Sequence, residues 1–189
     1  MKWRSIEEGD YFLFARSFHA AARKLAAATD TKPGLMSEFD FSPVLSMYRH
    51  AIELQLKAMV LGDAGKFLRE QPDGLSIHKT RSLSWLAQFV TQIVTALHWE
   101  AEFTCEGIED LAAFKSLIEE ANGIDAAFDV FRCPGGSHQD ALDFVHLLDV
   151  LLDLLQSTES SLLAEWDLRA EAAGGTEWDA GPDFGPTIH

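Results

Sequence analysis

Residues 42–61, SPVLSMYRHAIELQLKAMVL, predict a helix that is buried on most of its surface and around which the rest of the chain packs. Ser42 and Pro43 form a start signal, since serine caps helix N-termini and proline fits the first turn. Gly62 predicts the end near Leu61. The apolar residues form two stripes, one of Leu45, Tyr48, Ile52, Leu56 and Met59 and one of Met47, Ala51, Leu54, Ala58 and Leu61. Two stripes indicate a central helix of a bundle.

Helical periodicity extends over most of the remaining chain. It predicts helices over 10–28, about 76–99, about 108–121 and 124–131, and a long final helix capped by Ser137 that continues to about residue 173. No segment shows the alternation of a strand. We therefore expect an all-α fold, an up-and-down helical bundle of about five to six helices with a long acidic C-terminal helix. Residues 1–173 are expected to form one domain, and 174–189 an irregular tail.

Composition and charge restrict the class of protein. The chain has 189 residues, 47% of them hydrophobic, and no apolar run of the length that a membrane span requires. Two cysteines and an N-terminus without signal-peptide character favour the cytoplasm. The net charge is −15, and residues 138–189 carry eleven acids against one base. This acidity disfavours non-specific binding to DNA, which requires neutralisation of phosphates.

A polar stripe interrupts the apolar surface of the 42–61 helix. Arg49, Glu53 and Lys57 follow one another at four-residue spacing, and His50 lies beside Arg49. One reading is an internal ladder of ion pairs, Arg49 with Glu53 and Glu53 with Lys57. The other reading is the polar wall of a binding pocket. Both readings remain open at this point, and the second predicts that Arg49, Glu53, His78 and Arg132 converge in space.

The segment FRCPGGSH, residues 131–138, carries the most reactive pair of side chains. Arg132 and His138 are separated by five residues and precede the longest predicted helix. An arginine can bind a phosphate and a histidine can transfer a proton, which are the requirements for cleaving RNA without a metal. Asp143 and His146 have the spacing of a metal-binding helix, but no second such pair occurs in the chain. We therefore expect no metal and no cofactor.

Three motifs together resemble the HEPN superfamily of α-helical bundles. They are YRHAIELQLKA at residues 48–58, the predicted helix start at His78, and FRCP at residues 131–134, and they occur in the order found in that superfamily. The resemblance covers about residues 41–150. It implies a helical bundle that often dimerises and, in nuclease members, an arginine and histidine pair that cleaves RNA. Carried over, Arg132 would stabilise the charged phosphorane and His138 would act as general acid or base.

Two functional hypotheses follow. The first is a metal-independent endoribonuclease of toxin or phage-defence type that uses Arg132 and His138, with RNA as its substrate. The second is a non-catalytic HEPN-like homodimer that binds a partner protein or a small phosphorylated ligand. In both, the pocket is expected to include Arg49, His50, Glu53, Lys57 and His78. The Cys133-Pro134-Gly135-Gly136 insert and the acidic charge favour the second hypothesis, and the Arg132/His138 spacing favours the first.

Overall fold

The computed structural model describes residues 8–30, 41–124 and 138–174, and this part of the chain is all-α. Its elements are α1 (Glu8–Asp30), α2 (Ser42–Leu61), the 3-10 helix η2 (Asp63–Phe67), α3 (Gly74–Lys79), α4 (Leu83–Ala96), α5 (Leu111–Asn122) and α6 (His138–Gly174). An isolated bridge between Cys105 and Ile108 is the only strand-like pairing among these residues. The expected all-α bundle is thus confirmed.

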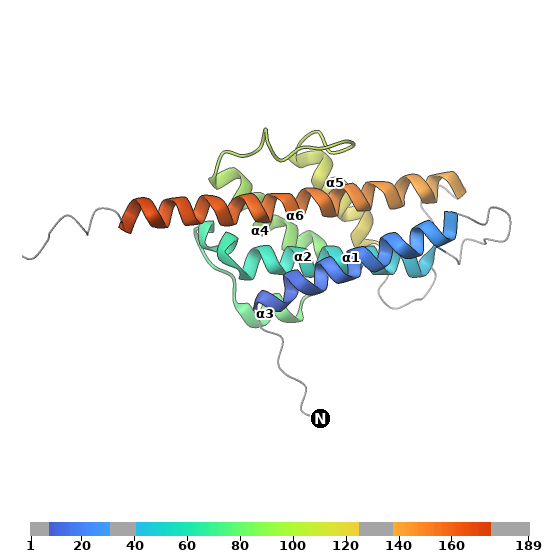
Figure 1. The fold of residues 1–189 in the computed structure, drawn as a ribbon, viewed down its shortest axis with the longest axis horizontal. Helices are drawn as coiled ribbons and strands as arrows, with labels where there is room; N and C mark the ends of the chain where they lie inside the picture. Colours follow the sequence, from blue (N-terminus) through green and yellow to red (C-terminus); the bar gives the residue numbers. More distant parts are fainter. Residues whose placement is uncertain (1–7, 31–40, 125–137, 175–189) are drawn as a thin grey trace, which may run out of the picture.

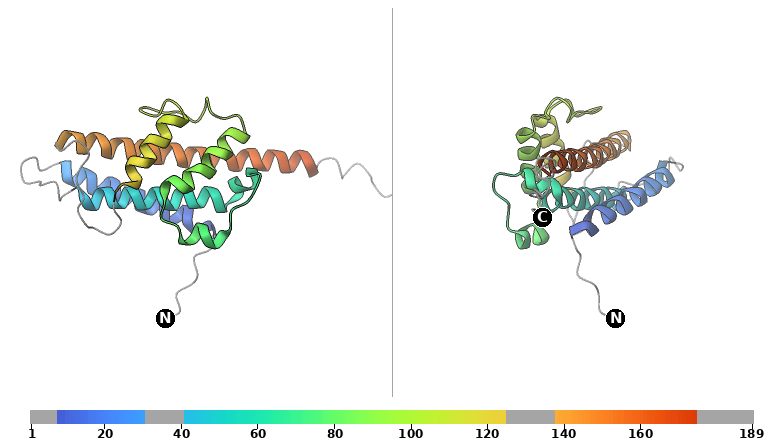
Figure 2. Two further views of the ribbon diagram at one scale, coloured as in Figure 1. Left: turned by 180° about the vertical axis from the view of Figure 1, so that it is seen from behind. Right: turned by 60° about the vertical axis from the view of Figure 1, so that its left-hand side comes forward.

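Three long helices give the molecule its elongated shape. Figure 1 shows α1, α2 and α6 along the longest axis, and Figure 2 shows α4 and α5 crossing them on the opposite face. Tyr48 bonds to Asp149 and Gln55 bonds to Glu159, so α2 and α6 run in the same direction. The C-terminal end of α6 extends beyond the other helices (Figure 1). No helix in the described ranges is long and apolar enough to cross a membrane.

The core forms around α2, as its two apolar stripes predicted. Tyr48, Ile52, Leu56 and Met59 are almost fully buried, and Leu54 and Ala58 of the second stripe are buried against α1. Burying apolar surface of this extent is the main favourable contribution to folding. Most residues of both stripes are buried within a single chain, so α2 supplies little of the spare apolar surface from which a dimer could be expected.

Two helix boundaries differ from the sequence prediction because other residues act as caps. Ser42 lies inside α2, whose N-cap is Phe41, and Pro43 occupies the first turn as expected. The predicted 108–121 helix begins only at Leu111, because the Asp110 carboxylate accepts hydrogen bonds from the N–H groups of Ala112 and Ala113.

The single helix predicted over about 76–99 is wrong, since this region forms two helices. Asp73 caps α3, which ends at Lys79, and Ser82 caps α4 by accepting a hydrogen bond from Trp85 N. The backbone is extended at Thr80, so the helix cannot continue through it. His78 consequently lies in the last turn of a short helix and not at the start of a long one.

Candidate functional site

The polar stripe of α2 forms the ion-pair ladder that its spacing predicts. Lys57 Nζ lies 2.8 Å from Glu53 Oε1, and Arg49 Nη1 lies 3.4 Å from Glu53 Oε2. All three side chains are buried. One acidic group thus lies between two basic groups, in a chain whose overall charge is strongly negative.

The same two cations hold the break between α3 and α4. Lys57 Nζ donates to the carbonyl of His78 at 3.2 Å, and Arg49 Nη2 donates to the carbonyl of Arg81 at 2.8 Å. Carbonyl groups at the end of a helix lack partners within that helix, and a buried one is costly unless another donor reaches it. The ladder therefore has a structural role, because it donates hydrogen bonds to carbonyl groups that the break leaves without helical partners.

His78 approaches the ladder through its backbone, while its imidazole points to α1. Its Nδ1 lies 2.6 Å from the hydroxyl of Tyr11, and the two rings are stacked with centroids 5.6 Å apart. The imidazole itself is exposed. Burial and the nearby Glu53 carboxylate raise the pKa of Tyr11, so its hydroxyl stays protonated at neutral pH. The contact between His78 and Lys57 is thus made by the main-chain carbonyl of His78, and its imidazole contacts Tyr11.

A pocket of about 430 Å³ opens on one side of the ladder. Arg49, His50 and Glu53 line it, and so does Arg81 from the link between α3 and α4. Its apolar walls are Phe18, Pro43 and Met47. Lys57 and His78, which the sequence placed in this pocket, are not among its lining residues.

Two of the arginine groups at this pocket lack a partner among the described residues. The Nε of Arg49 is buried and has no hydrogen-bond partner. The Arg81 side chain is exposed and forms no ion pair within the part of the chain that the structure describes. His50 packs edge-on against Phe18 at 4.5 Å, and burial lowers its pKa, which favours a neutral imidazole. An anion in this pocket would therefore lie near two arginines, of which Arg81 is the exposed one.

Arg132 lies outside the described residues, so its predicted convergence with Glu53 stays a prediction. His138 is the first residue of α6, and the position of its side chain is likewise outside the description. Asp149 lies at the level of Tyr48, and His138 precedes it by 11 positions, which is roughly 16 Å of helix. The start of α6 is thus displaced along the bundle from the level of Arg49.

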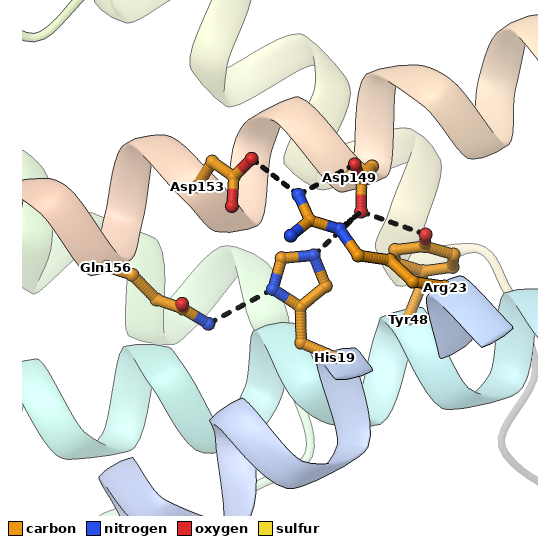
Figure 3. Close-up of polar contacts among 6 residues, drawn as sticks. All are labelled: His19, Arg23, Tyr48, Asp149, Asp153 and Gln156. Carbon is orange, nitrogen blue, oxygen red and sulfur yellow. Dashed lines mark hydrogen bonds and ion pairs between the residues drawn. The ribbon is translucent and has the colours of Figure 1, made fainter. Parts of the chain in front are cut away.

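A second polar cluster joins α1, α2 and α6, and the sequence did not predict it (Figure 3). Asp149 Oδ1 lies 2.7 Å from His19 Nε2 and from Arg23 Nε, and it accepts a 2.9 Å hydrogen bond from the hydroxyl of Tyr48. Arg23 also reaches Asp153 at 2.5 Å, and Gln156 Nε2 lies 3.2 Å from His19 Nδ1. No spacing within one helix signals this cluster, because its members come from three helices.

Electrostatics in this cluster favours an ionised Asp149. Burial opposes the charge, but the hydrogen bonds from Arg23, His19 and Tyr48 outweigh it and hold the pKa of Asp149 below its usual value. Burial and the Asp149 charge raise the pKa of Tyr48. Each of the six side chains drawn in Figure 3 contacts at least one other, so the cluster is suited to holding three helices together.

Among the described residues, no group of three histidine, cysteine, aspartate or glutamate side chains is arranged to hold a metal ion. No protein-family model, curated protein or solved structure matches this chain. A function must therefore be inferred from the motifs of α2 and from the chemistry of the pocket that they line.

Proposed function

We propose that this protein is a HEPN-like helical module that binds a small phosphorylated ligand in the pocket beside α2. The observation that carries the proposal is that two arginines, the exposed Arg81 and the buried Arg49, line one pocket of about 430 Å³. Guanidinium groups match the geometry of phosphate oxygens better than any other side chain. The volume falls in the range of small-molecule sites, and the apolar walls suit a ligand that also has an apolar part.

The distribution of charge favours a small ligand over a long polyanion. The ladder and Arg81 together place three cations against one carboxylate, in a chain with a net charge of −15. A local positive site attracts a small anion at short range. A long polyanion such as RNA must also approach the acidic surface around that site, which opposes its binding.

Thermal unfolding with 5′-AMP, inorganic phosphate and adenosine tests this proposal. We expect 5′-AMP to raise the melting temperature of the wild type, because a ligand that binds only the folded state stabilises it, and adenosine to have no effect. Arg81→Ala should weaken 5′-AMP binding at least about tenfold, as expected for losing a charge-assisted hydrogen bond. Lys79→Ala is the matched control, since Lys79 is exposed nearby and does not line the pocket. Equal binding by Arg81→Ala and the wild type would contradict the proposal.

A metal-independent endoribonuclease is the second candidate, and the start of α6 at His138 favours it. A helix N-terminus attracts anions, so the start of α6 could hold a phosphate close to the main chain of His138. In this reading the 2′-hydroxyl loses its proton to a base and attacks the adjacent phosphorus, and the bond to the 5′-oxygen of the next nucleotide breaks as that oxygen gains a proton. The protein would then act as a toxin or in phage defence. The wild type should then cleave RNA in the presence of EDTA, leave 2′,3′-cyclic phosphate ends and spare DNA.

Two substitutions test the second candidate directly. Arg132→Ala and His138→Ala should each lower the rate of RNA cleavage by about 10²-fold or more. Arg169→Ala is the control, because Arg169 pairs with Glu165 on the surface of α6. If wild type and variants leave RNA equally intact, the endoribonuclease reading is wrong and only the binding module remains.

We also propose that the protein acts as a homodimer in the cytoplasm. Two cysteines in 189 residues fit a reducing compartment. The apolar side chains of Leu13 and Phe14 on α1 are exposed next to each other and offer a surface for a second copy. Such a dimer would also agree with what the HEPN resemblance implies.

A further inference from the structure

A groove of about 710 Å³ lies on a different part of the surface from the proposed phosphate pocket. It is formed by α1, the C-terminal end of α2, η2, the segment before α3 and α6, and its lining includes Phe12, Leu61, Lys66, Pro72, Glu159 and Leu163. The groove and the phosphate pocket have no lining residue in common. Its volume is within the range of small-molecule sites.

The wall of this groove contains a buried carboxyl group without a counterion. Glu159 is only 7% exposed, and its Oε2 lies 2.6 Å from Nε2 of the fully buried Gln55. Within the described ranges, no lysine or arginine nitrogen lies within 4 Å of this carboxyl group. The Oε1 of Gln55 is also buried and has no partner.

Two other carboxylates that take part in buried networks have cationic partners. Glu53 lies between Arg49 and Lys57, and Asp149 is paired with Arg23. A buried charge normally requires such a partner, because removal from water is costly. Glu159 therefore departs from the rule that this protein otherwise follows.

The cations around the groove interact with groups other than Glu159. The Arg16 guanidinium lies over the ring of Phe12, 5.1 Å from its centroid, and Lys66 pairs with Asp63. Arg16 is near enough to favour ionisation of Glu159 but forms no ion pair with it. The groups that act on this carboxyl are thus Gln55 from α2 and Arg16 from α1, and Asp63 with Lys66 from η2 line the same groove.

We propose that this groove binds a small aliphatic amine whose ammonium group serves as the counterion of Glu159. The ammonium would form a charge-assisted hydrogen bond to the carboxylate, and the alkyl chain would lie along Phe12, Leu61 and Leu163. The net charge of −15 favours the approach of such a cation. This site is independent of the proposed phosphate pocket.

Calorimetric titration of the full chain with three matched ligands tests the proposal. Hexylamine carries the ammonium, hexan-1-ol has the same chain without charge, and hexanoate has the opposite charge. We expect saturable binding of hexylamine, with hexan-1-ol and hexanoate at least about tenfold weaker, as for loss of a charge-assisted hydrogen bond. Binding of hexan-1-ol or hexanoate as tightly as hexylamine would overturn the proposal, as would no binding of hexylamine. This comparison requires no variant.

A substitution locates the site. Glu159→Gln keeps the volume and the contact with Gln55 but removes the charge, and it should weaken hexylamine binding at least about tenfold. Glu171→Gln is the control, because Glu171 is exposed farther along α6 and does not line the groove. Unchanged affinity in Glu159→Gln would overturn the assignment.

Proton exchange provides a readout that a merely structural carboxyl would not change. Burial raises the pKa of Glu159 to about 7, so part of the population is protonated near pH 6.5. An ammonium that requires the carboxylate should displace this proton. Titrations in buffers of different ionisation enthalpy should therefore show proton release in the wild type and none in Glu159→Gln. Equal proton release in both proteins would contradict the proposal.

Discussion

Glu159 and Glu53 show how the environment of a single residue sets its charge. Both carboxyl groups are buried, but Glu53 has two cations within 4 Å and Glu159 has a carboxamide. Desolvation is the main cause that raises the pKa of Glu159 to about 7, with the Gln55 hydrogen bond and Arg16 opposing it. Glu159 thus binds a proton more tightly in the folded state than in the unfolded chain.

The raised pKa predicts that the Glu159 contribution to stability decreases with rising pH. The contribution is fully present below the unfolded pKa of about 4.5 and is lost as the pH rises through about 7, with a total of about 3 kcal/mol. Glu159→Gln should remove this dependence. The variant should therefore gain stability relative to the wild type between pH 5 and pH 8, which chemical denaturation at several pH values can measure. A constant difference between the two proteins would exclude the predicted linkage, and Glu171→Gln should show no such trend.

The sequence predicted one buried polar group well and missed another, for a simple geometric reason. Arg49, Glu53 and Lys57 lie on one helix at four-residue spacing, so their contacts are a local property of α2. Glu159 follows Ser157 and Thr158 on α6, where a glutamate would ordinarily be solvated. Its burial depends on the approach of Gln55 from α2, which is 104 positions away in the chain.

At the scale of helices, the Asp149 cluster fixes how α1 and α6 pack together. It supplies contacts from His19 and Arg23 of α1 and from Tyr48 of α2 to one carboxylate of α6 (Figure 3). The Asp149 side chain is 23% exposed, so solvent screens these interactions in part. The low pKa of Asp149 means that its contribution is present above about pH 3.8 and is lost as the pH falls below that value.

We therefore expect Asp149→Asn to destabilise the fold by about 2 kcal/mol at pH 7, a value reduced for partial exposure. Asp153→Asn is the matched control, because Asp153 contacts the same Arg23 but is 57% exposed and should cost less than about 1 kcal/mol. Urea unfolding of both variants measures the difference. Equal losses would show that the cluster around Asp149 adds nothing beyond a surface ion pair.

The error in the 76–99 region has a local cause. Ser82 could be read as a polar residue on the surface of a continuing helix, whereas its side chain caps the next helix. The break is further stabilised by groups far away in the chain, since Leu83 N donates to Asn122 Oδ1 and the carbonyl of Arg81 accepts from Arg49. These tertiary partners explain why periodicity alone did not reveal two helices. The same break places Arg81 in the pocket, so the missed boundary also hid a site residue.

At the scale of the whole molecule, exposed apolar side chains concentrate on long helices. Leu13 is 63% and Phe14 is 44% exposed on α1, while most residues of the α2 stripes are buried. We expect a homodimer in which α1 lies at the interface, with a mass near twice 21.0 kDa by light scattering. Replacing both Leu13 and Phe14 by serine should yield the monomer, and Lys24→Ser on the exposed side of α1 should not. A wild-type monomer at micromolar concentration would contradict this expectation.

A bound phosphate can be located relative to α2 by crystallography. A crystal structure of the protein grown with 5′-AMP should show the phosphate between the guanidinium groups of Arg49 and Arg81, with the adenosine against Phe18 and Met47. Crystals of Arg81→Ala grown in the same way should lack the ligand. A wild-type structure in which this pocket stays empty while 5′-AMP binds elsewhere would contradict a phosphate site between Arg49 and Arg81.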